Sequence, residues 1–284
     1  MEYVILYNPK AANGHGNEKV LELKTLLTGN ELTFKDLTTI HDMKEYIATL
    51  PEETYPIICG GDGTLFHLAN SLGDNIPTKN IYYYPVGSGN DFYRDVAEHP
   101  DKRELVLMNR YLTNLPKVTV NGETYRFING VGFGIDGYCC EVGDKLRETQ
   151  VEEINYAGIA IKGLLFHFKP VDAHIQVDNM SYQFEKAWLA PTMHGRFYGG
   201  GMMATPKQDR LNADKTNSVM IFHTKGRIGT LMDFPSIFKG EHVYKKNVSV
   251  FSGSGITVEF DHPCALQIDG ETFLNVSSYT VTNK

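Results

Sequence analysis

The turn Gly60-Gly61-Asp62-Gly63-Thr64 constrains the fold of this chain more than any other feature. The preceding residues 55–59 (YPIIC) are predicted to form a short buried strand, and apolar residues recur at helical spacing from Leu65 to Leu72. Glycine backbones let a phosphate approach the N–H groups closely, and the N-terminus of the following helix adds free donors and a positive dipole end. The sequence therefore predicts a phosphate-binding turn between a strand and a helix.

Asp62 is the carboxylate of this turn. It would repel a phosphate in direct contact, but it could hold a Mg²⁺ ion that bridges to the phosphate. The alternative interpretation is an ordinary tight turn in which Thr64 is the N-cap of the helix.

Two further turns have the same form. Residues 81–86 (IYYYPV) are predicted to form a strand that runs into Gly87-Ser88-Gly89-Asn90-Asp91, and residues 3–7 (YVILY) form another that ends in Asn8-Pro9 and a polar glycine loop. The third loop is not a Walker A motif, because the Gly-Lys-Ser/Thr ending is absent. Since the carboxyl ends of parallel strands lie along one edge of a sheet, these turns are expected to face one nucleotide.

The chain changes character near residue 115. Before this point strands alternate with helical stretches, as in a three-layer α/β/α domain built on a parallel sheet. Beyond it strands are denser, beginning with a hairpin at 118–125 that has an Asn-Gly turn, and a helical region at 136–168 interrupts them. The further predicted strands are 173–177, 182–189, 218–223, 248–251, 256–260 and 265–268.

Four motifs in order resemble the diacylglycerol kinase catalytic family, which includes bacterial lipid kinases and the sphingosine and ceramide kinases. They are Asn8-Pro9 with its glycine loop, residues 60–64, residues 87–91 and, near the end, Gln267-Ile268-Asp269-Gly270-Glu271. Residues 129–136 and 199–201 resemble further landmarks of the family. The resemblance implies a nucleotide-binding α/β domain at 1–115, similar to phosphofructokinase and NAD kinase, and a C-terminal β-sandwich domain at 116–274, with 275–284 as a segment that could return to the first domain.

The resemblance also implies transfer of the ATP γ-phosphoryl group to a lipid hydroxyl, with Mg²⁺ as the metal. It places Asp269 as the general base, since a carboxylate can accept the alcohol proton as the P–O bond forms, and Glu271 beside it. The alternative for Asp269-Gly270 is a plain two-residue hairpin turn. The nucleotide-binding residues implied are Asn8, Gly60, Gly61, Asp62, Gly63, Thr64, Gly87, Ser88 and Asn90. The metal-site residues implied are Asp62 and Asp91, and Asp214 is a further candidate from this sequence.

This sequence departs from the family pattern at two places that bear on the site. His67 stands where the family helix usually has Glu, and Asn212-Ala213-Asp214 stands where an Asp-Gly pair is common. Asp209 or Asp214 could replace the missing carboxylate, and spacing does not choose between them. The rivals to the lipid kinase are a kinase of a soluble alcohol such as NAD, and a nucleotide-binding regulatory protein that has lost catalysis.

Composition bounds the partners and the location. The net charge of −7 argues against nucleic-acid binding, no apolar run reaches membrane-span length, and four cysteines without metal-ligand spacing indicate a reducing cytoplasm. A lipid substrate requires peripheral contact with the inner face of the membrane, and the chain could be a monomer or a homodimer. Lys162 and Lys169 border an apolar helical stretch at 156–169 that is a candidate for this contact, although a helix packed on a sheet explains most of it. Lys239, Lys245 and Lys246 form a weaker basic cluster.

Overall fold

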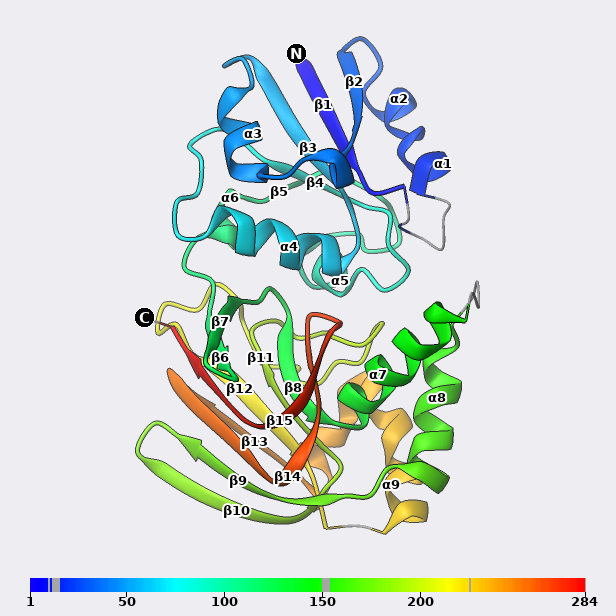
Figure 1. Cartoon of the computed structure of the whole chain (residues 1–284), viewed down its shortest axis with the longest axis vertical. Coiled ribbons are helices and arrows are strands. Elements are labelled where there is room, and N and C mark those ends of the chain that lie inside the picture. Colours follow the sequence, from blue (N-terminus) through cyan, green and yellow to red (C-terminus); the bar gives the residue numbers. More distant parts are fainter. Residues whose placement is uncertain (10, 12–15, 150–153, 225, 284) are drawn as a thin grey trace. The chain divides into compact units, whose positions relative to one another are not determined.

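The computed structural model describes residues 1–9, 11, 16–149, 154–224 and 226–283. The chain divides into two compact units, Met1–Leu115 and Pro116–Lys284 (Figure 1). Each unit has its own sheet and its own hydrophobic core.

The first unit is built on a five-stranded sheet in the order β2-β1-β3-β4-β5. The first four strands of this order are parallel, and only β5 is antiparallel to its neighbour. The elements in chain order are β1 (Glu2–Tyr7), α1 (Gly16–Val20), α2 (Leu23–Leu26), β2 (Glu31–Asp36), the 3₁₀-helix η2 (Leu37–Thr39), α3 (Met43–Thr49), β3 (Thr54–Gly60), α4 (Asp62–Leu72), β4 (Tyr82–Pro85), α5 (Asp91–Val96), β5 (Val106–Leu107) and α6 (Asn109–Leu112).

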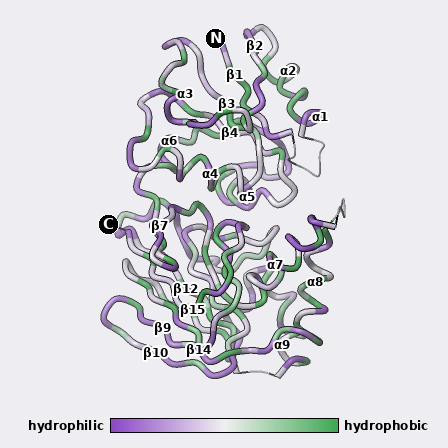
Figure 2. Tube along the Cα trace, in the orientation of Figure 1, coloured by the Kyte–Doolittle hydropathy of each residue, from purple (hydrophilic) through white to green (hydrophobic). Residues whose placement is uncertain are grey.

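Helices cover both faces of this sheet. Ile5 belongs to a buried cluster with Val20 and Leu23 of the first two helical segments, while its neighbours Val4 and Leu6 are also buried. Because successive strand residues point to opposite faces, both faces must be covered. Figure 1 shows α1 and α2 on one side of the sheet and α3 and α4 on the other. Figure 2 shows hydrophobic residues along β1 and β3. The predicted α/β/α domain is confirmed.

The second unit is an antiparallel sandwich-like domain with a helical part. Its strands are β6 (Lys117–Val120), β7 (Glu123–Arg126), β8 (Gly130–Gly134), β9 (Val171–Val177), β10 (Met180–Ala187), β11 (Leu189–Met193), β12 (Asn217–Phe222), β13 (Val248–Gly253), β14 (Gly255–Ile268) and β15 (Glu271–Thr282). The main sheet has the order β13-β12-β11-β8-β14-β15-β6-β7, and β9 pairs with both β14 and β10.

Strand β14 explains how the layers connect. The sequence predicts separate strands at 256–260 and 265–268, but the structure has one continuous strand. Its first part pairs with β9 and its last part with β8, and its register with β15 shifts between Glu259 and Cys264. An irregular ladder bends a strand, so β14 can serve both parts of the sandwich.

Other boundaries also differ from the sequence-based expectation. The strand predicted at 182–189 is two strands, β10 and β11, which separate at Trp188. Strand β8 has the sequence GVGFG, whose glycines give little β-propensity signal, and it was not predicted. The last strand, β15, pairs with β14 and β6. Residues 275–282 therefore belong to the second unit and do not return to the first.

The helical part of the second unit comprises α7 (Ile135–Glu148), α8 (Tyr156–Lys162), the π-helical segment η3 (Gly163–His167), α9 (Arg227–Asp233) and the 3₁₀-helices η4 (Phe234–Lys239) and η5 (Glu241–Tyr244). Buried side chains from these segments join Trp188, which lies between β10 and β11, and Phe222 of β12 in one core cluster. Among the residues that the structure describes, no helix is long and apolar enough to cross a membrane.

Candidate active site

In the first unit, the two predicted phosphate turns lie in van der Waals contact. A Cβ atom on Gly87 would lie 2.6 Å from Gly61 Cα. The Gly60 carbonyl accepts hydrogen bonds from Val86 N–H at 3.0 Å, Gly87 N–H at 3.2 Å and the Tyr83 hydroxyl at 3.0 Å. Gly60, Gly61 and Gly87 do not have positive φ, so glycine is needed here for close approach and not for a left-handed backbone.

Asp62 connects these two turns through its carboxylate. Oδ2 accepts the Asp91 N–H at 3.0 Å and Oδ1 accepts the Phe92 N–H at 2.9 Å, so Asp62 caps the N-terminus of α5 from the first turn of α4. The N-cap of α4 is Gly61, and its first helical residue is Asp62. Thr64, the N-cap in the alternative interpretation, instead lies in the first turn of the helix and packs against Gly60.

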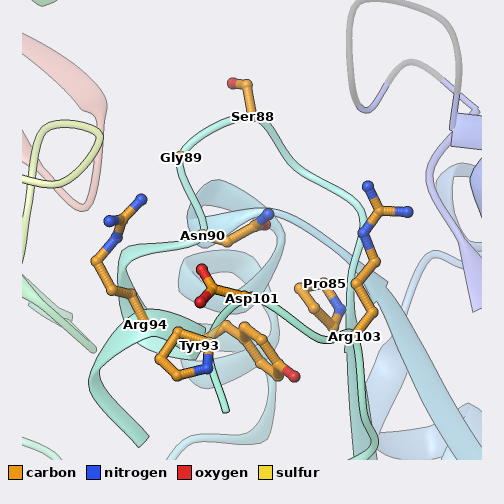
Figure 3. A pocket seen from close by; sticks show the side chains of 9 residues that line it. Pro85, Ser88, Gly89, Asn90, Tyr93, Arg94, Asp101 and Arg103 are labelled. Atoms are coloured by element: carbon orange, nitrogen blue, oxygen red, sulfur yellow. The ribbon is translucent and has the colours of Figure 1, made fainter. Parts of the chain in front are cut away.

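Asn90 closes the second turn. Its backbone is left-handed, with φ 52°, and its Nδ2 donates to the Gly87 carbonyl at 2.7 Å. Ser88 lies at the exposed tip of this turn (Figure 3). The turn borders a cavity of about 270 Å³.

This cavity contains charged residues that the sequence did not single out. Arg94 and Arg103 extend on either side of it in Figure 3, with Tyr93 and Asp101 between them. Arg103 also forms an ion pair with Glu22 at 2.8 Å. Guanidinium groups are suited to a phosphate or another anionic group. In the sequence, only the position of these arginines after a glycine turn indicated that they could lie near a bound phosphate.

Asn8 lies at the same edge of the sheet. It follows β1, its N–H donates to the Cys59 carbonyl at 3.3 Å, and its carbonyl accepts the Ala11 N–H at 3.0 Å. The strand registers place Tyr7 opposite Cys59, and Gly60 opposite Pro85. The three strand ends are therefore neighbours, as predicted. Most of the glycine loop predicted after Asn8, at Lys10 and residues 12–15, lies outside the described residues.

In the second unit, Asp269 forms the turn between β14 and β15. It has φ 49° and Gly270 has φ 94°, which gives the two-residue hairpin expected from the alternative interpretation. Its carboxylate is also held by three backbone donors: Oδ2 accepts the Ile128 N–H at 2.6 Å, and Oδ1 accepts those of Asn129 at 2.8 Å and Gly130 at 3.0 Å. The hairpin thus presents a carboxylate whose orientation is fixed.

Asn129 links Asp269 to a buried polar cluster. Its carbonyl accepts the His194 N–H at 2.8 Å, and its side-chain oxygen accepts Arg210 Nη2 at 3.3 Å. Arg210 is 8% exposed and also donates Nη1 to the Ile128 carbonyl at 2.9 Å. Both Arg210 and His194 were missed, because nothing in the local sequence connects them with residues 128–130.

The remaining predicted residues fall into different surroundings. Glu271 begins β15 opposite Ile268 and is partly buried. Asp214 is exposed in the turn after Leu211. Asn212 closes this turn, since its Oδ1 accepts the Thr216 N–H at 2.8 Å and its Nδ2 donates to the Asp209 carbonyl. The Asp209 carboxylate accepts the Leu211 N–H of the same turn. Within the described ranges, no three His, Cys, Asp or Glu side chains gather to hold a metal ion.

Comparison with protein families agrees with both units. Residues 2–115 match the family model for the diacylglycerol kinase catalytic domain, and residues 129–281 match that for the YegS C-terminal NAD kinase beta sandwich-like domain. The chain belongs to the diacylglycerol kinase catalytic family.

Several relatives from the diacylglycerol kinase family resemble this chain along most of its length. The Bacillus subtilis protein named "Putative lipid kinase YtlR" is 24% identical over 95% of this chain and 93% of its own. The B. subtilis protein named diacylglycerol kinase is 27% identical over 81% of this chain and 75% of its own. A crystal structure of a diacylglycerol kinase from Bacillus anthracis superposes with a TM-score of 0.59 at 17% identity, covering 99% of this chain and 94% of that one, and shows the same fold.

One buried carboxyl of the family motif at 129–136 has an unusual environment. Asp136 is the second residue of α7, and its Oδ1 accepts the Gly137 N–H at 3.0 Å. Burial raises the pKa of Asp136 to about 7, although the Gly137 N–H and the nearby Gln267 amide act to lower it. Gln267 is two residues before Asp269 on β14. Asp136 therefore packs against the strand that carries the predicted base.

This environment predicts a pH-dependent stability. The folded chain keeps the Asp136 proton up to about pH 7, whereas the unfolded chain releases it near 3.8. The stabilisation is thus complete at low pH and is lost as the pH rises through 7. Between pH 5 and 7 the free energy of unfolding should fall by about 2–3 kcal/mol relative to Asp136→Asn, which keeps the acceptor for Gly137 but does not titrate. Urea unfolding of both proteins across this range measures the difference; parallel stability curves would contradict the prediction.

Proposed function

We propose that this chain is an ATP-dependent lipid kinase that transfers the γ-phosphoryl group to the hydroxyl of diacylglycerol or a related lipid at a membrane surface. Membership of the diacylglycerol kinase catalytic family supports phosphoryl transfer. The single observation that carries the proposal is the Asp269 carboxylate, which is held by three N–H groups in a tight turn.

The first unit supplies the nucleotide-binding groups. The contacting turns at Gly61 and Gly87 leave no side chain between backbone and phosphate, and α4 begins directly after Gly61, so the positive end of its dipole lies at this turn. Ser88 and Asn90 add neutral polar groups, while Arg94 and Arg103 line the adjacent cavity. These features suit the polyphosphate of ATP.

Asp62 and Asp91 would hold the Mg²⁺ ion of the nucleotide. Mg²⁺ usually keeps several waters and takes one or two carboxylates together with substrate phosphates, so two carboxylates on neighbouring turns fit it without a three-residue protein cage. Since both Asp62 oxygens already accept backbone N–H groups, we expect Asp62 to act through a bound water. When bound, the ion neutralises charge on the phosphate oxygens.

Asp269 acts as the general base in this proposal. It accepts the proton of the lipid hydroxyl while the hydroxyl oxygen forms its bond to the γ-phosphorus and the bond from that phosphorus to the β-γ bridging oxygen breaks, with ADP as the leaving group. Fixed orientation suits this role because proton transfer requires hydrogen-bonding distance and alignment. Glu271, two residues along the chain, would help to organise the acceptor.

The reaction is tested by transfer of label from γ-labelled ATP with Mg²⁺ into a panel of lipids in mixed micelles, with NAD as the soluble alcohol. We expect a labelled lipid and no labelled NADP, since the proposed acceptor is a lipid hydroxyl. Labelled NADP without labelled lipid would favour the NAD kinase alternative. Tight ATP binding by the folded protein with no transfer to any acceptor would favour the regulatory alternative.

A further inference from the structure

Arg210 has an unusual environment for a cationic side chain. Among the arginines and lysines that the structure describes, it alone is buried, with 8% of its surface exposed. A buried guanidinium loses its hydration and needs hydrogen-bond acceptors in place of the lost water. Its Nη1 donates to the Ile128 carbonyl at 2.9 Å, and its Nη2 donates to Asn129 Oδ1 at 3.3 Å. Arg210 is therefore attached to the loop between β7 and β8.

The same loop holds the carboxylate of Asp269. The Ile128 carbonyl and the Asn129 N–H belong to one planar peptide unit. The carbonyl accepts Arg210 Nη1, and the N–H donates to Asp269 Oδ1 at 2.8 Å. Hydrogen bonds at the two ends of a peptide unit polarise it in the same direction and strengthen one another. Arg210 therefore strengthens and orients a donor that holds the proposed base.

The next peptide unit of the loop repeats this arrangement. The Asn129 carbonyl accepts the backbone N–H groups of His194 at 2.8 Å and Gly195 at 3.2 Å. On the other side of this peptide unit, the Gly130 N–H donates to Asp269 Oδ1 at 3.0 Å. The Asp269 N–H in turn donates to the Gly130 carbonyl at 3.0 Å. The carboxylate cannot turn away from the loop unless several hydrogen bonds break together.

The segment that carries Arg210 is closed by its own side chains. Gln208 Nε2 donates to the Thr216 carbonyl at 2.9 Å, and Asn212 Oδ1 accepts the Thr216 N–H at 2.8 Å. These bonds span the residues on both sides of Arg210 and fix the backbone from which its side chain extends. The sequence predicts a metal-site carboxylate in this segment, and the structure shows that the segment also delivers a buried cation to the loop at residues 128–129.

We propose that Arg210 is a positioning residue for phosphoryl transfer. It acts through the peptide unit between residues 128 and 129 and through the Asn129 side chain, and it fixes the orientation of the Asp269 carboxylate. A general base must be aligned with the hydroxyl proton that it accepts, and misplacement by about 1 Å can lower a rate by about 10²-fold. This inference deepens the proposed function and rests on it, since Asp269 is the base of that reaction.

The experiment places Arg210→Met in the unchanged chain and in Asp269→Asn, and measures kcat and KM by transfer of label from γ-labelled ATP to the lipid. In the unchanged chain, kcat should fall by about 10–100-fold through loss of alignment, and KM for ATP should stay the same. In Asp269→Asn the same substitution should leave kcat nearly unchanged, because the base on which Arg210 acts is already absent. An equal loss of kcat in both backgrounds, or a higher KM with unchanged kcat, would overturn the proposal.

Arg210→Lys is a second variant that keeps the buried charge. Its single ammonium replaces the two-pronged guanidinium, so it should lower kcat by less than Arg210→Met does. If Arg210→Met does not fold, Arg210→Lys decides the question by the same comparison. A loss of kcat that disappears in Asp269→Asn supports the proposal, whereas no loss in the unchanged chain, or an equal loss in both backgrounds, overturns it.

Arg227→Met is the matched control in the same unit. Arg227 Nη1 also donates to a backbone carbonyl, that of Leu164, at 2.8 Å. Urea unfolding measures the stability of each variant, and Arg227→Met should leave kcat unchanged. A comparable loss of kcat in Arg227→Met would show that destabilisation alone explains the effect. Transfer that depends on Asp269 but not on Arg210 would overturn this inference alone, whereas no transfer by the unchanged chain would overturn the proposed function as well.

Discussion

Asp269→Asn should lower the rate of phosphoryl transfer by about 10²–10⁴-fold, the range by which general-base groups accelerate reactions. Asparagine has nearly the same shape and tolerates the left-handed backbone at φ 49°. Its Oδ1 can still accept the N–H groups of Asn129 and Gly130, but its amide would face the Ile128 N–H. One unsatisfied donor costs about 1–3 kcal/mol of stability. We therefore expect the variant to be destabilised but folded, and inactive. The initial rate with γ-labelled ATP and urea unfolding together measure both effects.

Gly270→Ala is the matched control for the hairpin. Gly270 has φ 94° and open space within 4 Å of the position of a Cβ atom, so alanine strains the turn without touching the Asp269 carboxylate. It should cost about 1–2 kcal/mol and retain most of the activity per folded molecule. If Asp269→Asn stays within tenfold of the unchanged chain, or if Gly270→Ala is equally inactive, Asp269 anchors the hairpin and is not the base.

The two interpretations of residues 268–271 illustrate what sequence could decide. Asp-Gly predicted a hairpin turn and the family resemblance predicted a catalytic carboxylate, and the structure has the turn with a carboxylate fixed by residues 128–130. Local sequence cannot reveal the latter contact, because the partners are about 140 residues away in the chain. Arg210 and Asn129 were not assigned to this environment for the same reason.

The fold could be predicted from the sequence where the hydrophobic periodicity and the turn residues indicate the same secondary-structure element. Strands β1, β3 and β4 have apolar runs bounded by glycine or proline, and each was predicted within two residues of its ends. Strand β8 was missed because its side chains are mostly glycine, and β14 was divided because His262 and Pro263 interrupt its apolar pattern. Pairing with long-range partners gave these segments their strand conformation despite weak local preference.

The nucleotide turns show both what local sequence predicts and what only long-range contacts reveal. Three glycines in the first turn and two in the second marked a close approach of the backbone, and the sequence assigned this approach to a phosphate. The structure shows that the glycines also allow the turns to approach one another, since a Cβ atom on Gly87 would lie only 2.6 Å from Gly61 Cα. Substitution at this contact should therefore impair stability and nucleotide binding together.

Gly87→Ala should weaken ATP binding at least tenfold and lower the free energy of unfolding by about 1–3 kcal/mol, the usual cost of overpacking. The new Cβ would lie 2.6 Å from Gly61 Cα and 2.8 Å from Asn90 Oδ1, so the backbone itself must shift and the phosphate-binding N–H groups shift with it. Gly61→Ala meets only Gly87 Cα, at 3.2 Å, and should have a smaller effect. Gly255→Ala on β14 is the control, because its nearest contact is an ordinary 3.7 Å and alanine is favoured over glycine in a strand. Calorimetry with ATP and urea unfolding should rank the losses in the order Gly87, Gly61, Gly255; equal ATP affinity in all three variants would show that the contact between the turns does not shape the nucleotide site.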